Sequence, residues 1–316
     1  MSISQSSSSG ILLVDKPAGL TSHDVVARAK RLLHVKKVGH AGTLDPFATG
    51  LLVLLIGEGT KLSANLMEGS KLYTAEIKLG EKTDTADSTG TIIERKSFEH
   101  YSEETIKKAL EQFVGTIKQK PPMYSALKKK GTPLYKLARK GIEVDREERE
   151  VTIKDIELLS SSLSSITLRV LCSKGTYVRT LAEAISETLG TCGHLKELRR
   201  LESGTFCIED AVRMENLEDA ELIGSKMITL SEAMPLMPQI VVGREAVKRI
   251  CDGNSLIAEW IKDVKPENIV KGQKMKVVDS TGTLLSLAEA VNEFRLGCDV
   301  PSELIVGKSL RVFNGL

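Results

Sequence analysis

A fourteen-residue loop, Gly39 to Leu52, constrains this chain more than any other stretch. It reads G-H-A-G-T-L-D-P-F-A-T-G-L-L, so three glycines, a histidine and an acid followed by proline stand together. The apolar run from Leu51 to Ile56 predicts a buried strand directly after it. Glycines let a ligand approach the backbone, and loops fixed to a rigid strand commonly carry reactive groups. We therefore predict a functional site around Asp45. In the alternative interpretation, Asp45 and Pro46 only cap a helix or start a turn.

The composition is that of an ordinary folded protein: 316 residues, 41% hydrophobic and 27% charged. This length predicts two domains. The net charge is only +2, so affinity for nucleic acid has to come from local clusters of basic residues. Five cysteines without a C-x-x-C pair indicate reduced thiols rather than disulfides or a zinc site. The serine-rich residues 1–10 predict a loose, disordered tail. We see no signal peptide or membrane-spanning run, and we expect a cytoplasmic protein.

Strand and helix patterns alternate along the first two thirds of the chain. The expected strands are residues 11–14, 51–56, 71–79 and 166–172. Thr21 with Asp24 resembles a capping box, and Ser102 predicts a second helix start. Tyr73 lies within a predicted strand, where a tyrosine is usually half-buried with a wet hydroxyl. Asp84 and Asp87 sit in a polar loop without metal-ligand spacing, and we interpret them as turn formers.

Arg179 stands in the first turn of the helix expected after Ser173–Gly175. A cation at this place opposes the helix dipole, so the arrangement is easiest to accept if a carboxylate pairs with it. No acid lies within the turn, and we therefore expect the partner to be Asp45. The alternative is a surface arginine that extends into solvent. The L-R-R-L sequence that begins at Leu198 is expected at the end of a strand or helix.

Residues 116–141 form a basic stretch without any acid. Its cations are Lys118, Lys120, Lys128, Lys129, Lys130, Lys136, Arg139 and Lys140. Tyr124 and Tyr135 are interleaved with them, and three prolines prevent a single regular element. Basic residues with aromatics on such a segment are typical of a clamp on a phosphate backbone. We favour an RNA clamp over about 116–150; the alternative is a solvated surface.

The sequence changes character after Met234–Pro238, which we interpret as a linker. Short alternating strands, a turn at Ser280–Gly282 and one helix over 244–251 predict a small β-barrel in residues 239–316. No P-loop, dinucleotide fingerprint, metal cluster or nucleophile elbow is present. One loop carboxylate without an evident second acid argues against ordinary glycoside hydrolysis, which needs two.

Several motifs together resemble the TruB-type tRNA pseudouridine synthases. Besides the Asp45 loop, these are D-K-P-A-G-L-T-S-H-D from Asp15, G-x-G-T-K from Gly57, K-L-Y-T-A-E-I-K-L-G from Lys71, P-P-M-Y-S-A-L-K from Pro121, C-S-K-G-T-Y-V-R-T-L from Cys172, and L-R-R-L. They occur in one order and cover about residues 11 to 205. The C-terminal part resembles a PUA domain more loosely. The resemblance implies a pseudouridine-synthase α/β fold, a mixed and mostly antiparallel sheet flanked by helices, over residues 11–233.

The resemblance also implies the activity: isomerisation of uridine 55 in the T-loop of tRNA, without metal or cofactor. Asp45 would be the catalytic aspartate and Arg179 its salt-bridge partner, while Tyr73 would stack on the uracil and assist proton removal from C5. Leu198 would pack against the base, and His40 would fill the gap left by the flipped nucleotide. Further substrate contacts are expected from the matched motifs and the clamp, at Lys16, Lys61, Lys128, Lys129, Lys130, Arg139, Tyr177 and Arg199.

Two other functions remain open on the sequence. The first is a guide-RNA-dependent synthase of the same fold, and the second is a tRNA-folding chaperone without catalysis. The basic stretch favours an enzyme that grips the T-arm stem-loop itself, so we expect a monomer that needs no protein partner. Whether Asp45 attacks C1′ or removes the 2′ proton is not decided by the residues.

Overall fold

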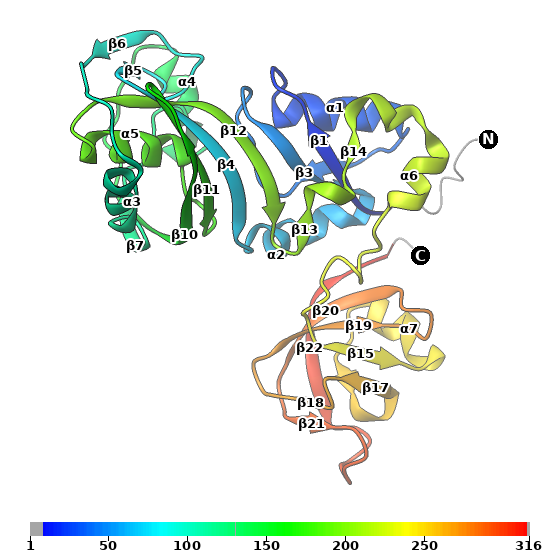
Figure 1. The fold of residues 1–316 in the computed structure, drawn as a ribbon. Helices are drawn as coiled ribbons and strands as arrows, with labels where there is room; N and C mark the ends of the chain where they lie inside the picture. Colours follow the sequence, from blue (N-terminus) through cyan, green and yellow to red (C-terminus); the bar gives the residue numbers. More distant parts are fainter. Residues whose placement is uncertain (1–8, 130, 315–316) are drawn as a thin grey trace.

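The computed structural model describes residues 9–129 and 131–314. The predicted tail up to Ser8 and the predicted clamp residue Lys130 therefore lie outside the described residues. A long, twisted sheet with helices at its sides makes up the first part of the molecule, and a second, smaller sheet lies below it (Figure 1). In the described chain, no helix is long and apolar enough to span a membrane.

Ten strands form the large sheet, in the order β14-β1-β3-β12-β4-β11-β10-β7, with β2 on β3 and β13 on β12. The bounds are β1 Gly10–Lys16, β2 Val38–His40, β3 Thr49–Ile56, β4 Lys71–Leu79, β7 Gly115–Gln119, β10 Arg149–Ser161, β11 Ser165–Cys172, β12 Gly193–Ser203, β13 Phe206–Cys207 and β14 Val212–Arg213. Within this sheet, β1–β14 and β3–β12 pair in parallel, and the other described strand pairs are antiparallel. The predicted mixed, mostly antiparallel α/β fold is confirmed.

Helices flank this sheet. They are α1 Ser22–Leu32, α2 Ser63–Met67, α3 Glu103–Glu111, α5 Val178–Thr188 and α6 Ala220–Lys226, with 3₁₀ turns η1 Gly57–Leu62, η2 Ile208–Asp210 and η3 Met214–Glu218. The predicted capping box is present, because Thr21 accepts from the Asp24 amide while Asp24 accepts from the Thr21 amide. Ser102 caps α3 through the Thr105 amide, as predicted. These caps satisfy donors that a helix start leaves free.

Three two-stranded sheets and the C-terminal sheet complete the fold. The two-stranded sheets are β5 Glu81–Thr83 with β6 Ile92–Arg95, β8 Lys128–Lys129 with β9 Thr132–Pro133, and β18 Asn268–Ile269 with β21 Phe294–Arg295. The six-stranded C-terminal sheet contains β15 Gln239–Val242, β16 Leu256–Ile257, β17 Ile261–Lys265, β19 Lys274–Val278, β20 Leu284–Ala290 and β22 Ile305–Val312, with α7 Arg244–Cys251 and η4 Ala258–Trp260. It encloses its own apolar core. The curled sheet fits the small barrel predicted for this region.

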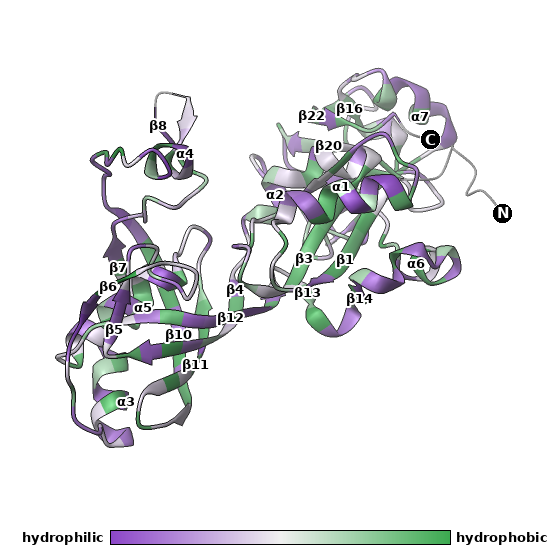
Figure 2. Ribbon diagram, turned by 90° about the horizontal axis from the view of Figure 1, so that it is seen from above, coloured by the Kyte–Doolittle hydropathy of each residue, from purple (hydrophilic) through white to green (hydrophobic). Residues whose placement is uncertain are grey.

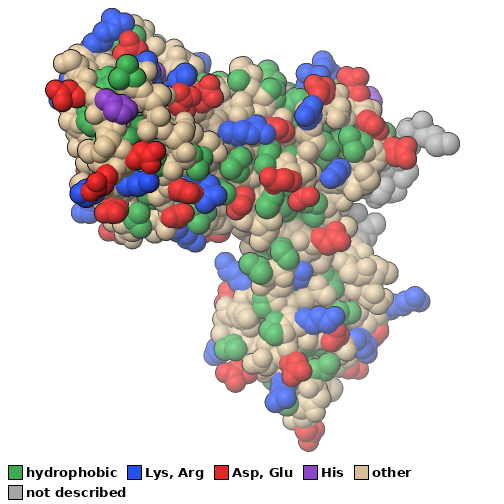
Figure 3. All heavy atoms as spheres, viewed as in Figure 1, with side chains coloured by type: hydrophobic (Ala, Val, Ile, Leu, Met, Phe, Trp, Pro, Cys, Tyr) green, Lys and Arg blue, Asp and Glu red, His purple; other side chains and the backbone are tan. Residues whose placement is uncertain are grey.

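The basic stretch stands apart from the sheet. Figure 2 shows β8 and α4 (Leu134–Ala138) projecting beyond the edge that β7 and β10 form. We name residues 120–146, which lie between these two strands, the basic hairpin. As predicted, its described residues contain no single long element. Figure 3 shows acidic and basic side chains interspersed over one face of the molecule, as expected from a net charge of only +2.

Candidate active site

The Asp45 loop connects β2 to β3 without any helix, so the interpretation of Asp45 as a helix cap is wrong. Asp45 does start a turn, because the Ala48 amide donates to its carbonyl at 3.1 Å. Several hydrogen bonds hold the loop in place. The buried Ser22 hydroxyl, at the start of α1, accepts from the Leu44 amide at 2.8 Å and donates to the Leu44 carbonyl at 3.0 Å. The Gly19 amide donates to the Pro46 carbonyl at 2.8 Å. The loop is therefore fixed on both sides of Asp45.

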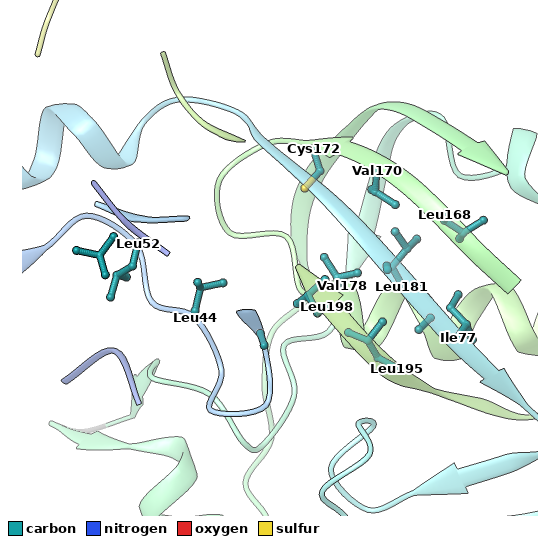
Figure 4. Close-up of a cluster of buried hydrophobic side chains, with 14 of the residues drawn as sticks. Leu44, Leu52, Ile77, Leu168, Val170, Cys172, Val178, Leu181, Leu195 and Leu198 are labelled. Atoms are coloured by element: carbon teal, nitrogen blue, oxygen red, sulfur yellow. The ribbon is translucent and has the colours of Figure 1, made fainter. Parts of the chain in front are cut away.

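Arg179 brings the loop and α5 together. Its Nε lies 2.9 Å from Oδ2 of Asp45, and its Nη2 lies 3.2 Å from Oδ1. The Arg179 side chain is 4% exposed, whereas the Asp45 side chain is 33% exposed. Figure 4 shows the residues just before them, Leu44 and Val178, in one apolar cluster with Leu198. Packing of these apolar neighbours fixes the positions of Asp45 and Arg179 relative to each other.

Asp87 is a second acid at Arg179, and the sequence did not identify it. Its Oδ2 lies 3.5 Å from Nη1 of Arg179, and its side chain is only 6% exposed. It also accepts from the Thr85 hydroxyl and the Thr89 amide, so the predicted turn-forming role is present as well. The sequence feature that could have identified it is the loop T-D-T-A-D-S-T-G, in which two acids stand without a basic partner assigned to them. Burial distinguishes Asp87 from the exposed Asp84.

A cavity of about 730 Å³ opens above Asp45. Its walls come from the loop, from β4, from the β11–α5 turn and from the root of the basic hairpin, including Gly42, Thr43, Lys71, Tyr73, Ser125, Thr176, Tyr177, Arg179, Leu198 and Arg200. Among predicted site residues, it therefore gathers Asp45, Tyr73, Tyr177, Arg179 and Leu198. Glu68 and Glu150 also line the cavity, and Glu68 pairs with Lys174 at the surface. The Asp45 carboxylate beside two tyrosines and an apolar wall suits a planar, uncharged ring attached to a sugar.

Burial controls the protonation of these groups. It raises the pKa of the Asp45 carboxyl above its usual value; Arg179 opposes that shift, and the Asp87 charge adds to it. Burial likewise raises the pKa of the Tyr73 hydroxyl, against the influence of the Arg200 guanidinium. Lys71 is buried in the cavity wall, which lowers its pKa to about 8. Asp45 is thus a carboxylate of raised basicity in contact with a permanent cation.

Comparison with known proteins identifies the family. Residues 30–178 match the TruB family pseudouridylate synthase (N terminal domain), and residues 179–234 match the tRNA pseudouridylate synthase B C-terminal domain. A relative named tRNA pseudouridine synthase B from Burkholderia lata is 43% identical over 94% of this chain and 90% of its own. The chain belongs to the TruB family of pseudouridylate synthases. The TruB-family protein of the same name from Syntrophotalea carbinolica is 46% identical over 80% of this chain and 84% of its own.

Solved structures agree on the TruB-type fold. A Cbf5–Nop10–Gar1 complex contains a chain that superimposes with a TM-score of 0.73 and 26% identity, covering 96% of this chain and 84% of that one. A chain of an H/ACA RNP bound to a substrate RNA containing 2′-deoxyuridine superimposes with a TM-score of 0.74 and 24% identity, covering 96% of this chain and 85% of that one. The likeness extends over both sheets, since nearly the whole chain is covered.

Two lysines of this TruB-family chain bind groups of the protein itself. Lys16 is completely buried, and its ammonium donates to the carbonyls of Pro17, Leu20 and Pro46. It supports the loop from inside, and its predicted substrate contact stays a prediction. Lys61 lies outside the cavity wall, where it pairs with Glu58 and donates to the Val312 carbonyl at 2.8 Å. Its ammonium joins η1 to the end of β22 instead of facing the cavity.

Arg199 and His40 also lie outside the cavity wall. Arg199 makes a two-pronged ion pair with Asp15, at 3.0 and 2.7 Å, so its fork is already occupied. It and Leu198 belong to the middle of β12, and the expectation of an element end is wrong. His40 ends β2, where it is half-buried beside Leu54, and burial lowers its pKa. Its predicted role stays a prediction.

The described clamp residues Lys128, Lys129 and Arg139 are exposed on the basic hairpin. Arg139 stacks over the Tyr135 ring at 5.6 Å, and Lys129 donates to the Asp145 carbonyl. In the described chain, no three His, Cys, Asp or Glu side chains stand together as a metal site.

Proposed function

We propose that this TruB-family chain isomerises uridine to pseudouridine at position 55 in the T-loop of tRNA. The observation that carries the proposal is the Asp45–Arg179 pair, at 2.9 Å, at the cavity of about 730 Å³. The relatives' printed name, tRNA pseudouridine synthase B, supports tRNA as the substrate. The choice of position 55 rests on the motif resemblance.

The chemistry needs few groups. The N1–C1′ bond breaks, the uracil turns, a C5–C1′ bond forms, and the C5 proton leaves while N1 gains one. We assign to Asp45 the step at the ribose, either attack on C1′ or removal of the 2′ proton, because its carboxylate faces the cavity and burial raises its pKa. Arg179 keeps that carboxylate oriented.

The remaining site residues take in this proposal the roles that the family resemblance implies. Tyr73 lies on β4 with its ring in the cavity wall, suited to stack on the uracil and to assist removal of the C5 proton. Leu198, on the neighbouring strand β12, packs against the base from its own side. Tyr177 contributes to the wall at the start of α5. His40 would fill the gap in the RNA stack.

The target uridine has to leave its stack before it reaches Asp45, which costs a few kcal/mol. Phosphate contacts by the basic hairpin would supply binding free energy for this step. We propose two domains, residues 11–233 and 239–316, of which the second is a PUA-like RNA-binding domain. We also propose that the enzyme acts in the cytoplasm as a monomer.

A tritium-release assay tests the proposal and its rivals. Purified protein is mixed with an unmodified tRNA transcript that carries tritium at C5 of uridine, without guide RNA or other protein. We expect release at one site, and loss of release when U55 is replaced by cytidine. Release that needs an added guide RNA would support the guide-dependent alternative. Binding and refolding of tRNA without any release would support the chaperone.

A further inference from the structure

Arg200 is the largest of the fully buried side chains, with 1% of its surface exposed. It lies on β12 at the centre of the large sheet. On one side of it stands Gly50 of β3, and on the other stands Tyr73 of β4. The predicted roles included its neighbours Leu198 and Arg199 but gave none to Arg200.

The Arg200 guanidinium binds the backbone of the catalytic loop. Nε donates to the Leu51 carbonyl at 2.7 Å, Nη2 to the Gly42 carbonyl at 3.0 Å, and Nη1 lies 3.4 Å from the Thr43 carbonyl. These carbonyls stand on both sides of Asp45 in the chain. One planar fork therefore fixes where the loop leaves β2 and where it enters β3.

The backbone is shaped around this residue. A Cβ at Gly50 would lie 2.3 Å from the Arg200 carbonyl oxygen, and Gly50 has φ 98°. A Cβ at Gly42 would meet Nη1 of Arg200 at 3.4 Å, with φ 103°. Only glycine adopts such φ values without strain. At Gly50 both the positive φ and the close main chain of Arg200 require glycine. At Gly42 the positive φ alone requires it, because a Cβ at 3.4 Å from Nη1 would make an ordinary contact.

Neutral carbonyl groups stabilise a buried guanidinium less than a carboxylate would. The burial of Arg200 is therefore poorly explained by its contribution to folding stability alone. Arg200 also lines the cavity, beside Tyr73 and the loop. We propose that Arg200 is a positioning residue for the isomerisation, holding the loop so that Asp45 meets Arg179 and the cavity at the productive distance. This inference rests on the proposed function.

Steady-state kinetics of Arg200→Gln and Arg200→Lys test it. Displacement of a reacting group by about 1 Å costs on the order of 100-fold in rate. We expect Arg200→Gln to lower kcat by about 100-fold with KM within about threefold, and Arg200→Lys to recover part of the loss. Arg169→Gln is the matched control, because this arginine of β11 is exposed, pairs with Glu157 at the surface and should keep kcat near wild type.

The pH profile separates positioning from a merely structural role. Loosening the loop would admit water to Asp45, lower its pKa and move the acid limb of kcat to lower pH. A smaller folded fraction would reduce kcat equally at every pH. Each variant is assayed well below its own Tm. If Arg200→Gln does not fold, the pH profile of Arg200→Lys is used for the test. Wild-type turnover in Arg200→Lys with an unmoved acid limb would overturn the inference, whereas absence of wild-type isomerisation would overturn the proposed function itself.

Discussion

Arg179 donates a hydrogen bond from Nη2 to the main-chain carbonyl of Tyr124 at 2.7 Å, across 55 residues of chain. The same guanidinium contacts Asp45 and Asp87. Tyr124 belongs to the root of the basic hairpin, so one side chain connects that root to the reactive carboxylate. Movement of the hairpin on RNA would be transmitted to the site through this contact.

Asp45→Asn should abolish turnover while tRNA binding stays within a few-fold, because the carboxylate acts only in the chemical step. Burial raises the pKa of Asp45, so its ionised form is less favourable in the folded protein than in the unfolded chain. The variant should therefore keep the wild-type Tm or exceed it. Single-turnover assays and thermal melts check both points, with Asp84→Asn, an exposed acid of the turn, as control. Near-normal turnover in Asp45→Asn would refute the assignment.

Arg179→Lys should reduce kcat by at least about 100-fold, because one ammonium cannot meet Asp45, Asp87 and the Tyr124 carbonyl together. Arg179→Ala should in addition lower Tm, since Asp87 would stay buried without its cation. Kinetics and melts of both variants are compared with Arg169→Lys, an exposed arginine paired with Glu157. Full activity in Arg179→Lys would mean that the fork is dispensable.

As the pH is lowered, kcat/KM should begin to fall at a higher pH than it would if Asp45 had the pKa of an ordinary aspartate. The carboxylate of Asp45 disappears as the pH drops through its pKa, which burial raises above the usual value of about 3.9. Asp87→Asn removes a negative neighbour that contributes to the rise, so the acid limb of kcat/KM should move to lower pH. An acid limb that moves upward in this variant would contradict the assigned electrostatics.

The sequence predicted the local elements well because their signals are local. The capping box at Thr21, the strand around Tyr73 and the bounds of α7 needed only periodicity and cap residues. The dipole argument at Arg179 also led to Asp45, although 134 residues separate them. A prediction was wrong where residues adjacent in sequence do not determine the bounds of the element. Leu198, which was expected at the end of a strand or helix, lies in the middle of β12.

Burial of charged groups is what the sequence could not reveal. Lys16, Asp87 and Arg200 look like ordinary surface residues in a one-dimensional pattern. Lys16 donates to the Pro46 carbonyl, 30 residues further along the chain. Asp87 lies against Arg179 on α5, and Arg200 donates to the Leu51 carbonyl on β3. These partners are distant in sequence, so they become visible only when the fold is known.

The basic hairpin leads to the last prediction. Lys128 and Lys129 are exposed on β8, which projects from the sheet, and their stretch contains little to bury (Figure 2). If they neutralise phosphates, changing both to Ala should weaken tRNA binding and flatten the log–log salt slope by about one to two units. Thermal stability should stay unchanged. Binding is measured by filter retention at several salt concentrations.

Lys107→Ala with Lys108→Ala is the matched control, because these lysines are also exposed, lie on α3 and pair with Glu103 and Glu104. This control should leave the salt slope unaltered. Limited proteolysis adds an independent readout: cleavage within residues 121–141 should slow when tRNA is added, because phosphate contacts order a segment with few buried contacts. An unchanged slope in the Lys128 and Lys129 variant, or equal cleavage with and without tRNA, would make these lysines a solvated surface.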